Sequence, residues 1–179
     1  MAVLRTLRRG DLPSLVRFVN KLVAEKRVNP TLGITLDKRV TSETEKGYLS
    51  KMLKGLKRGD VISVVAQVRG EIVGNCEITR RTFSGELHHT GTLGIAILDG
   101  CRDVGLGGRM LQILLMEARR AGIRVVELEV FSVNAAARRL YERLGFKEVG
   151  VVPRKVLRKG KYFDSVAMYA DLGTDKSTG

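Results

Sequence analysis

The stretch Arg102-Asp-Val-Gly105-Leu-Gly107-Gly108-Arg109 separates an apolar segment from a segment with helical periodicity. Glycine has no Cβ, so backbone amides in such a turn can approach a ligand closely. The first turn of the following helix presents unpaired N–H groups and the positive end of its dipole, and the two arginines add charge-assisted donors. The stretch therefore predicts an anion site suited to a pyrophosphate, although a tight turn without a ligand explains the glycines as well.

The same stretch excludes two familiar nucleotide motifs. A P-loop requires Gly-Lys-Ser/Thr, which does not follow here, and a dinucleotide fingerprint requires a third glycine where Met110 stands.

Hydrophobic patterns on both sides of the turn predict a single α/β domain. We expect a mixed central sheet of about seven strands flanked by about four helices, with the domain over 1–172 and a short flexible tail over 173–179. The expected strands are Val3–Leu7, Val61–Val68, Glu71–Ile78, His89–Leu98, Ile123–Phe131, Phe146–Val152 and Tyr162–Ala170. The expected helices start after a cap at Asp11, at Ser42 with Glu45 completing a capping box, near Gly105 and near Ala135.

Composition narrows the classes of function. A 44% apolar fraction supports a core, and no apolar run is long enough to span a membrane, so we expect a cytoplasmic protein without a membrane partner. Cys76 and Cys101 stand apart from each other and from any histidine cluster, which predicts no metal site. The net charge of +13 suits an anionic cofactor, an acidic protein or nucleic acid. The basic residues are scattered and lack interleaved aromatic residues, which disfavours nucleic acid as a partner.

A second motif follows the glycine turn. Asn134 begins the segment Asn134-Ala-Ala-Ala-Arg-Arg-Leu-Tyr141-Glu-Arg-Leu-Gly145-Phe146 and is expected to cap its helix. Tyr141 comes seven residues later, close to two helical turns, so both side chains project from one side of that helix.

Together these motifs resemble the GNAT superfamily of acyl-CoA-dependent N-acyltransferases. The matching pieces are Arg102-x-x-Gly105-x-Gly107, the Asn134 and Tyr141 helix, and the apolar strand Leu93-Gly-Ile-Ala-Ile97 ahead of the turn. The element order agrees as well, over about residues 2–171. The resemblance implies an N-acetyltransferase that moves acetyl from acetyl-CoA to a primary amine by direct attack.

The resemblance also implies roles for individual residues. Backbone groups of Ile95, Ala96 and Ile97 would pair with the pantetheine arm, and Asn134 would contact the same arm. Tyr141 would donate a proton to the departing thiolate, although packing in the core is the alternative for this side chain. The pyrophosphate would lie on the turn formed by Arg102, Asp103, Val104, Gly105, Leu106, Gly107, Gly108 and Arg109.

A base is needed because an amine attacks a thioester only when it is neutral. Alternation in the segment 126–130 places Glu127 and Glu129 on one face of a strand. Glu129 stands five residues before the Asn, the position of the base in the ribosomal-protein-alanine acetyltransferase branch, and is the predicted base. A salt-bridged surface carboxylate is the alternative, and Glu77, His88 and His89 are weaker candidates.

Two hints about the acceptor conflict. Glu129 favours a protein or peptide amine, N-terminal or lysine, which we rank slightly first. The segment 158–168 resembles branches that acetylate free amino acids, polyamines or other small amines, which is the alternative. The third hypothesis is a basic module that binds CoA or nucleic acid and catalyses no reaction. A homodimer is compatible with the sequence.

Overall fold

The computed structural model describes residues 2–173, and the part of the predicted tail over 174–179 lies outside the described residues. Its elements follow the predicted order of strands and helices, with two short 3-10 turns added. The strands are β1 (Val3–Arg5), β2 (Val61–Val68), β3 (Glu71–Arg80), β4 (Thr90–Ile97), β5 (Val125–Phe131), β6 (Lys147–Arg158) and β7 (Lys161–Asp171). The helices are α1 (Leu12–Val28), α2 (Ser42–Arg58), α3 (Leu106–Arg120) and α4 (Ala135–Arg143), with 3-10 turns at Arg9–Asp11 and Gly85–Leu87.

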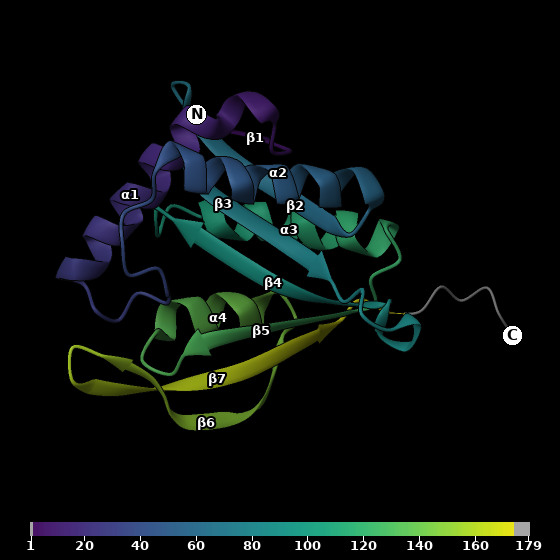
Figure 1. Cartoon of the computed structure of the whole chain (residues 1–179). Helices are drawn as coiled ribbons and strands as arrows, with labels where there is room; N and C mark the ends of the chain where they lie inside the picture. Colours follow the sequence, from purple (N-terminus) through teal and green to yellow (C-terminus); the bar gives the residue numbers. More distant parts are fainter. Residues whose placement is uncertain (1, 174–179) are drawn as a thin grey trace, which may run out of the picture.

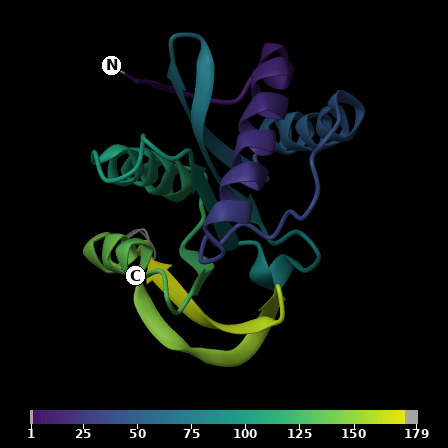
Figure 2. The ribbon, with the colours of Figure 1, turned by 90° about the vertical axis from the view of Figure 1, so that its left-hand side faces the viewer.

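The sheet confirms the predicted α/β class. Its seven strands lie in the order β1-β2-β3-β4-β5-β7-β6, and β4–β5 is its parallel pair. Figure 2 shows α1 and α2 on one face of the sheet and α3 and α4 on the other. Each face therefore has its own hydrophobic cluster, one toward α3 and α4 and one toward α1 and α2.

The pairing between β4 and β5 is unusually short. The two strands pair only at Thr90↔Val125, Gly91↔Val126 and Thr92↔Glu127. A Cβ on Gly91 would lie 2.6 Å from Cγ2 of Ile78, so glycine permits the close packing at this junction. Beyond it the strands diverge toward their arrowheads, as Figure 1 shows. β4 continues to pair with β3 and β5 with β7, so the sheet is split between its two middle strands.

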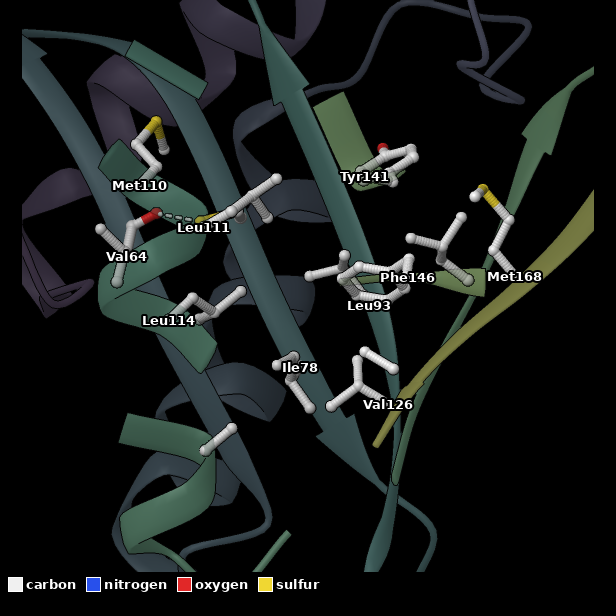
Figure 3. Close-up of a cluster of buried hydrophobic side chains, with 14 of the residues drawn as sticks. Val64, Ile78, Leu93, Met110, Leu111, Leu114, Val126, Tyr141, Phe146 and Met168 are labelled. Carbon is white, nitrogen blue, oxygen red and sulfur yellow. Dashed lines mark hydrogen bonds between the residues drawn. The ribbon is translucent and has the colours of Figure 1, made fainter. Parts of the chain in front are cut away.

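The core on the α3 side joins the two halves of the split sheet. Figure 3 shows Met110, Leu111 and Leu114 of α3 on one side of this cluster, with Tyr141, Phe146 and Met168 on the other. The three α3 side chains are fully buried. Their spacing of one and four residues places them on one face of the helix.

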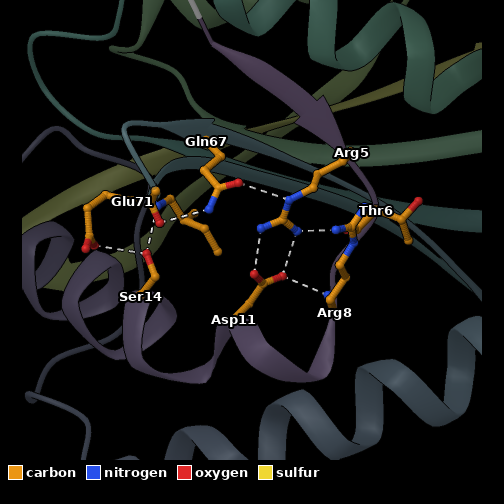
Figure 4. Close-up of polar contacts among 9 residues, drawn as sticks. Arg5, Thr6, Arg8, Asp11, Ser14, Gln67 and Glu71 are labelled. Atoms are coloured by element: carbon orange, nitrogen blue, oxygen red, sulfur yellow. Dashed lines mark hydrogen bonds and ion pairs between the residues drawn. The ribbon is translucent and has the colours of Figure 1, made fainter.

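A polar network fixes the start of the chain against the sheet. The Arg5 guanidinium donates to both carboxylate oxygens of Asp11, at 2.9 and 2.6 Å, and the Arg8 amide donates to the same carboxylate at 2.7 Å (Figure 4). Ser14 then links α1 to β3 by donating to Glu71 and accepting from the Ile72 amide. Asp11 precedes α1 as expected, but its side chain serves this network and makes no cap hydrogen bond to the helix.

Two local predictions were wrong. The cap of α2 is Thr41, whose hydroxyl accepts from the Thr44 amide, and Ser42 is already the first helical residue. β6 extends to Arg158 and does not end at Val152. Pro153 interrupts the pairing of β6 with β7, and the ladder resumes at Val156↔Phe163, so the apparent end of the strand is an irregularity within it.

None of the helices within residues 2–173 combines the length and the apolar character needed to cross a membrane.

Candidate functional site

The split between β4 and β5 opens into a cleft with a volume of about 1370 Å³. Its walls come from the diverging parts of β4 and β5, the turn before α3, the start of α4 and the segment after α1. The sequence-predicted residues Ile95, Ala96 and Ile97 line it, together with Asn134 and Tyr141. The structure thus brings together side chains and backbone from motifs up to 46 positions apart.

The edge of β4 that faces the cleft is open beyond Thr92. Ile95, Ala96 and Ile97 pair with Cys76, Asn75 and Gly74 of β3 on one side, and none of the strands within residues 2–173 pairs with them on the other. Peptide groups along an open strand edge are donors and acceptors that need partners. A ligand with its own amide groups can therefore add to this edge as a further strand would, which fits the predicted contact with a pantetheine arm.

The glycine turn forms the end of the cleft nearest the start of α3. Gly105 has φ +77°, in the left-handed region that glycine enters freely, and α3 begins at the next residue. In the described part of the chain, no side chain forms a cap hydrogen bond at the start of α3. A Cβ on Gly107 would lie 3.2 Å from Ile97 and 3.3 Å from Leu140, so this glycine lets the helix start close to β4 and α4. These features fit an anionic group at the helix N-terminus.

Arg102 lines the cleft, but its guanidinium is engaged by the protein. Its Nε donates to the Ile97 carbonyl at 2.8 Å, and it forms an ion pair with Glu25 of α1. Arg102 therefore fixes the end of β4 against α1 and shapes the turn. The sequence had predicted it as a direct donor to the pyrophosphate. Asp103, Val104 and Arg109 are exposed around the same turn, and Leu106 is buried beneath it.

The α4 motif is positioned as predicted. The Asn134 side chain accepts from the Ala137 amide at 3.2 Å and so caps the helix at the wall of the cleft. Tyr141 is 7% exposed, and its ring centroid lies 5.7 Å from that of Phe146. Within residues 2–173 no hydrogen bond engages the Tyr141 hydroxyl, and the residue borders the cleft. Burial raises the pKa of Tyr141 to about 12, so it is a protonated phenol at neutral pH.

Glu127 and Glu129 share one face of β5, as the alternation predicted, and both line the cleft. Glu127 forms an ion pair with Arg81, the residue that directly follows β3. One oxygen of Glu129 accepts from Lys155 of β6 at 2.5 Å and the other accepts from Ser165 of β7 at 3.2 Å. The Glu129 side chain is about half exposed, at 54%. Its role as the base stays a prediction.

Glu77 is a carboxylate whose pKa is raised by burial. It lies on β3 opposite Gly94 of β4, and its Oε2 accepts from Asn75 at 2.9 Å. Burial raises the pKa of Glu77 to about 7, only partly offset by the Asn75 hydrogen bond. Sequence reasoning ranked it below Glu129, although the alternation Asn75-Cys76-Glu77-Ile78 already placed both polar side chains on one face. His88 and His89, the other weaker candidates, are exposed outside the cleft.

One buried arginine holds a segment that forms part of the cleft wall. Arg158 of β6 is 8% exposed and donates to the carbonyls of Pro30, Leu32 and Ile34 at 2.5, 2.7 and 2.8 Å. These carbonyls belong to the segment between α1 and α2, whose residues line the cleft. Arg158 therefore fastens this segment to the β6–β7 hairpin across the sheet.

Comparison with known proteins agrees with this geometry. The model of the acetyltransferase (GNAT) family matches residues 34–146. The chain belongs to this family. An L-methionine sulfoximine/L-methionine sulfone acetyltransferase from Pseudomonas aeruginosa is 26% identical to it over 172 residues, which cover 94% of this chain and 93% of the relative.

Solved structures agree in fold. An acetyltransferase of the GNAT family from Streptococcus pneumoniae superposes with a TM-score of 0.83 at 28% identity, covering 96% of this chain and 99% of that one. A phosphinothricin acetyltransferase from Sinorhizobium meliloti in complex with acetyl-CoA superposes with a TM-score of 0.81 at 18% identity, covering 99% and 92%. The protein is thus an acyltransferase, a GNAT N-acetyltransferase whose cosubstrate is acetyl-CoA.

We expect the substitution Glu77→Gln to stabilise the fold at alkaline pH. The pKa of Glu77 rises from 4.5 to about 7 on folding, so the folded state keeps a proton that the unfolded state releases. That contribution to stability is complete below pH 4.5 and is lost as the pH rises through about 7. The variant should match the wild-type Tm near pH 4.5 and exceed it at pH 8, by the equivalent of up to about 3 kcal/mol.

Thermal unfolding at the two pH values measures this effect. The matched control is Glu71→Gln on the same strand, whose carboxylate is exposed and paired with Arg17, so its removal should not raise the Tm at pH 8. Equal Tm values for wild type and Glu77→Gln at pH 8 would show that Glu77 ionises without a burial penalty.

Proposed function

We propose that this enzyme acetylates the primary amine of a small, amino-acid-like acceptor. The observation that carries the proposal is the set of hydrogen bonds from the Arg158 guanidinium to the carbonyls of Pro30, Leu32 and Ile34. Arg158 holds the segment between α1 and α2, part of which lines the cleft, and Lys26 holds the same segment from α1 by contacts to Leu36 and Asp37. A cleft whose wall is held in this way suits a small molecule better than a protein surface.

The relatives support the same class of acceptor. The Pseudomonas aeruginosa relative, similar over more than nine-tenths of both chains, is named for two small amino-acid derivatives, L-methionine sulfoximine and L-methionine sulfone. A relative from Salmonella typhimurium with the same name is 29% identical over 110 residues. A protein or peptide amine, which the sequence ranked first, stays the second candidate because Glu129 does line the cleft.

The residues suggest how acetyl-CoA is held. The uncapped amides at the start of α3 are suited to the pyrophosphate, with Gly105 and Gly107 giving the close approach. Arg109, exposed beside them, adds positive charge. The pantetheine arm would then follow the open edge of β4 at Ile95, Ala96 and Ile97 toward Tyr141, with Asn134 beside it.

Chemistry follows from that placement. The acceptor amine attacks the thioester carbon, the C–N bond forms, and the C–S bond breaks as the tetrahedral intermediate collapses. The departing CoA thiolate needs a proton, and the Tyr141 hydroxyl is a protonated donor without a competing partner in the described chain. Peptide N–H groups on the open edge of β4 are suited to stabilise the oxyanion.

The acceptor is tested with a panel of amines. Purified enzyme, acetyl-CoA and one amine each are incubated, and CoA release and acetylated product are measured by absorbance and mass spectrometry. We expect L-methionine sulfone or L-methionine sulfoximine to give a kcat/KM at least 100-fold above that of N-terminal or lysine-containing peptides. A preference for the peptides would contradict the proposal.

Tyr141→Phe tests the leaving-group role. The substitution removes one hydroxyl and almost no volume, so the fold and the affinity for acetyl-CoA should persist while kcat falls by roughly 10- to 1,000-fold. Isothermal titration gives the affinity and steady-state kinetics give kcat. If kcat stays within a factor of two, Tyr141 serves only the packing that it shares with Phe146.

A further inference from the structure

We propose that Glu77, on β3, is the base that takes the proton from the acceptor amine. The assignment rests on the proposed function for the position of the thioester along the open edge of β4. It replaces the predicted base, Glu129, with a carboxylate on the neighbouring strand at the point where the sheet splits.

The first argument is position. Glu77 lies opposite Gly94, which lines the cleft two residues beyond Thr92, the last β4 residue paired with β5. A Cβ on Gly94 would lie 3.0 Å from Oε1 of Glu77 and 3.5 Å from its Cδ. The carboxylate therefore occupies the space that a side chain at position 94 would fill, beside the backbone of a β4 residue that lines the cleft.

The second argument is the state of the two carboxylate oxygens. Oε2 accepts from the Asn75 side chain, which fixes the orientation of the group. Oε1 accepts no hydrogen bond from residues 2–173, and it is not among their fully buried polar atoms that lack a partner. This oxygen is therefore left for an amine or for one intervening water. In Glu129, by contrast, Lys155 and Ser165 engage both oxygens.

The third argument is the electrostatic setting. Asn75 donates a hydrogen bond to Glu77 and Tyr48 of α2 interacts with it electrostatically, whereas Cys76, its neighbour in sequence, points into the α3-side cluster. Glu45 of α2 interacts with Tyr48 in turn, and none of these groups is a cation. Burial raises the pKa values of Tyr48, Glu45 and Cys76, which keeps the tyrosine and the thiol protonated. Without a cation to hold it ionised, Glu77 titrates near neutrality, where a base both is deprotonated and accepts a proton readily.

The acid and the base then lie on opposite faces of β4. Leu93, Ile95 and Ile97 pack in the cluster that contains Tyr141, whereas Gly94 and Ala96 face the side of Glu77 and α2. The amine enters from the Glu77 side and the thiolate departs on the Tyr141 side. One amine proton passes to Glu77 and from there to solvent, and the second replaces the proton that Tyr141 gives to the thiolate. The balance is one ammonium and one acetyl-CoA consumed, one amide, one CoA thiol and one proton formed.

The kinetic test compares wild type with Glu77→Gln, Glu129→Gln and Glu71→Gln, using acetyl-CoA and L-methionine sulfone over pH 6–10. Wild-type kcat/KM should rise to an inflection near pH 7 and then level off. Glu77→Gln should lose about 100-fold or more at pH 7 and keep rising with pH until the amine itself deprotonates, so the deficit shrinks at pH 10. Glu71→Gln should follow wild type. A parallel profile for Glu77→Gln, or this signature in Glu129→Gln instead, would overturn the proposal.

If no amine of the panel is acetylated, that result refutes only the proposed acceptor. A second measurement then tests Glu77 as the base independently of the acceptor. In protein labelled with ¹³C at the glutamate side-chain carboxyl, one resonance should titrate near pH 7 and disappear in Glu77→Gln. A spectrum in which Glu77 titrates like an exposed glutamate would overturn the base assignment, whatever the acceptor. Glu77→Gln has the size and shape of the original residue, and its Tm at pH 8 shows whether it folds.

Discussion

The short pairing between β4 and β5 is the constraint on which the rest of this molecule depends. Three residue pairs hold the strands together, and then β4 stays with β3 while β5 stays with β7. Two open strand edges inside one sheet would ordinarily be a liability, because their peptide groups lack partners. Here the split forms the cleft, the N-termini of α3 and α4 border it, and the open edge of β4 is the surface on which we propose that acetyl-CoA binds.

Packing maintains this split. Gly91 leaves room for the Ile78 side chain of β3 beside the paired ends of β4 and β5. The α3-side cluster spans both halves of the sheet through Leu93, Tyr141 and Met168. Outside the core, Arg102 ties the end of β4 to α1 and Arg158 ties β6 to the segment after α1. Both arginines use carbonyl acceptors within the chain, which shows that part of the strong positive charge is structural.

Much of the fold was predictable from the sequence because the patterns that encode it are local. Alternating strands, the helical stripe of α3 and the caps at Gly105 and Asn134 each depend on a few neighbouring residues. The full length of β6 was not predictable, since Pro153 usually ends a strand and the later pairing depends on β7. The ion pair of Arg102 with Glu25 and the contacts of Arg158 were hidden for the same reason, because these partners lie more than 70 positions away in sequence.

The site was predictable in outline, and its chemistry depends on burial. Sequence spacing singled out the glycine turn, Asn134 and Tyr141 as candidates. It cannot distinguish a carboxylate paired with a cation from one buried without a cation, which is the difference between Glu129 and Glu77.

The central claim is that the open edge of β4 receives acetyl-CoA, and hydrogen–deuterium exchange tests it directly. Acetyl-CoA should slow exchange in a peptide covering residues 93–97 and leave a peptide covering β2, residues 61–68, unchanged. Unchanged exchange at residues 93–97 under saturating acetyl-CoA would contradict the account.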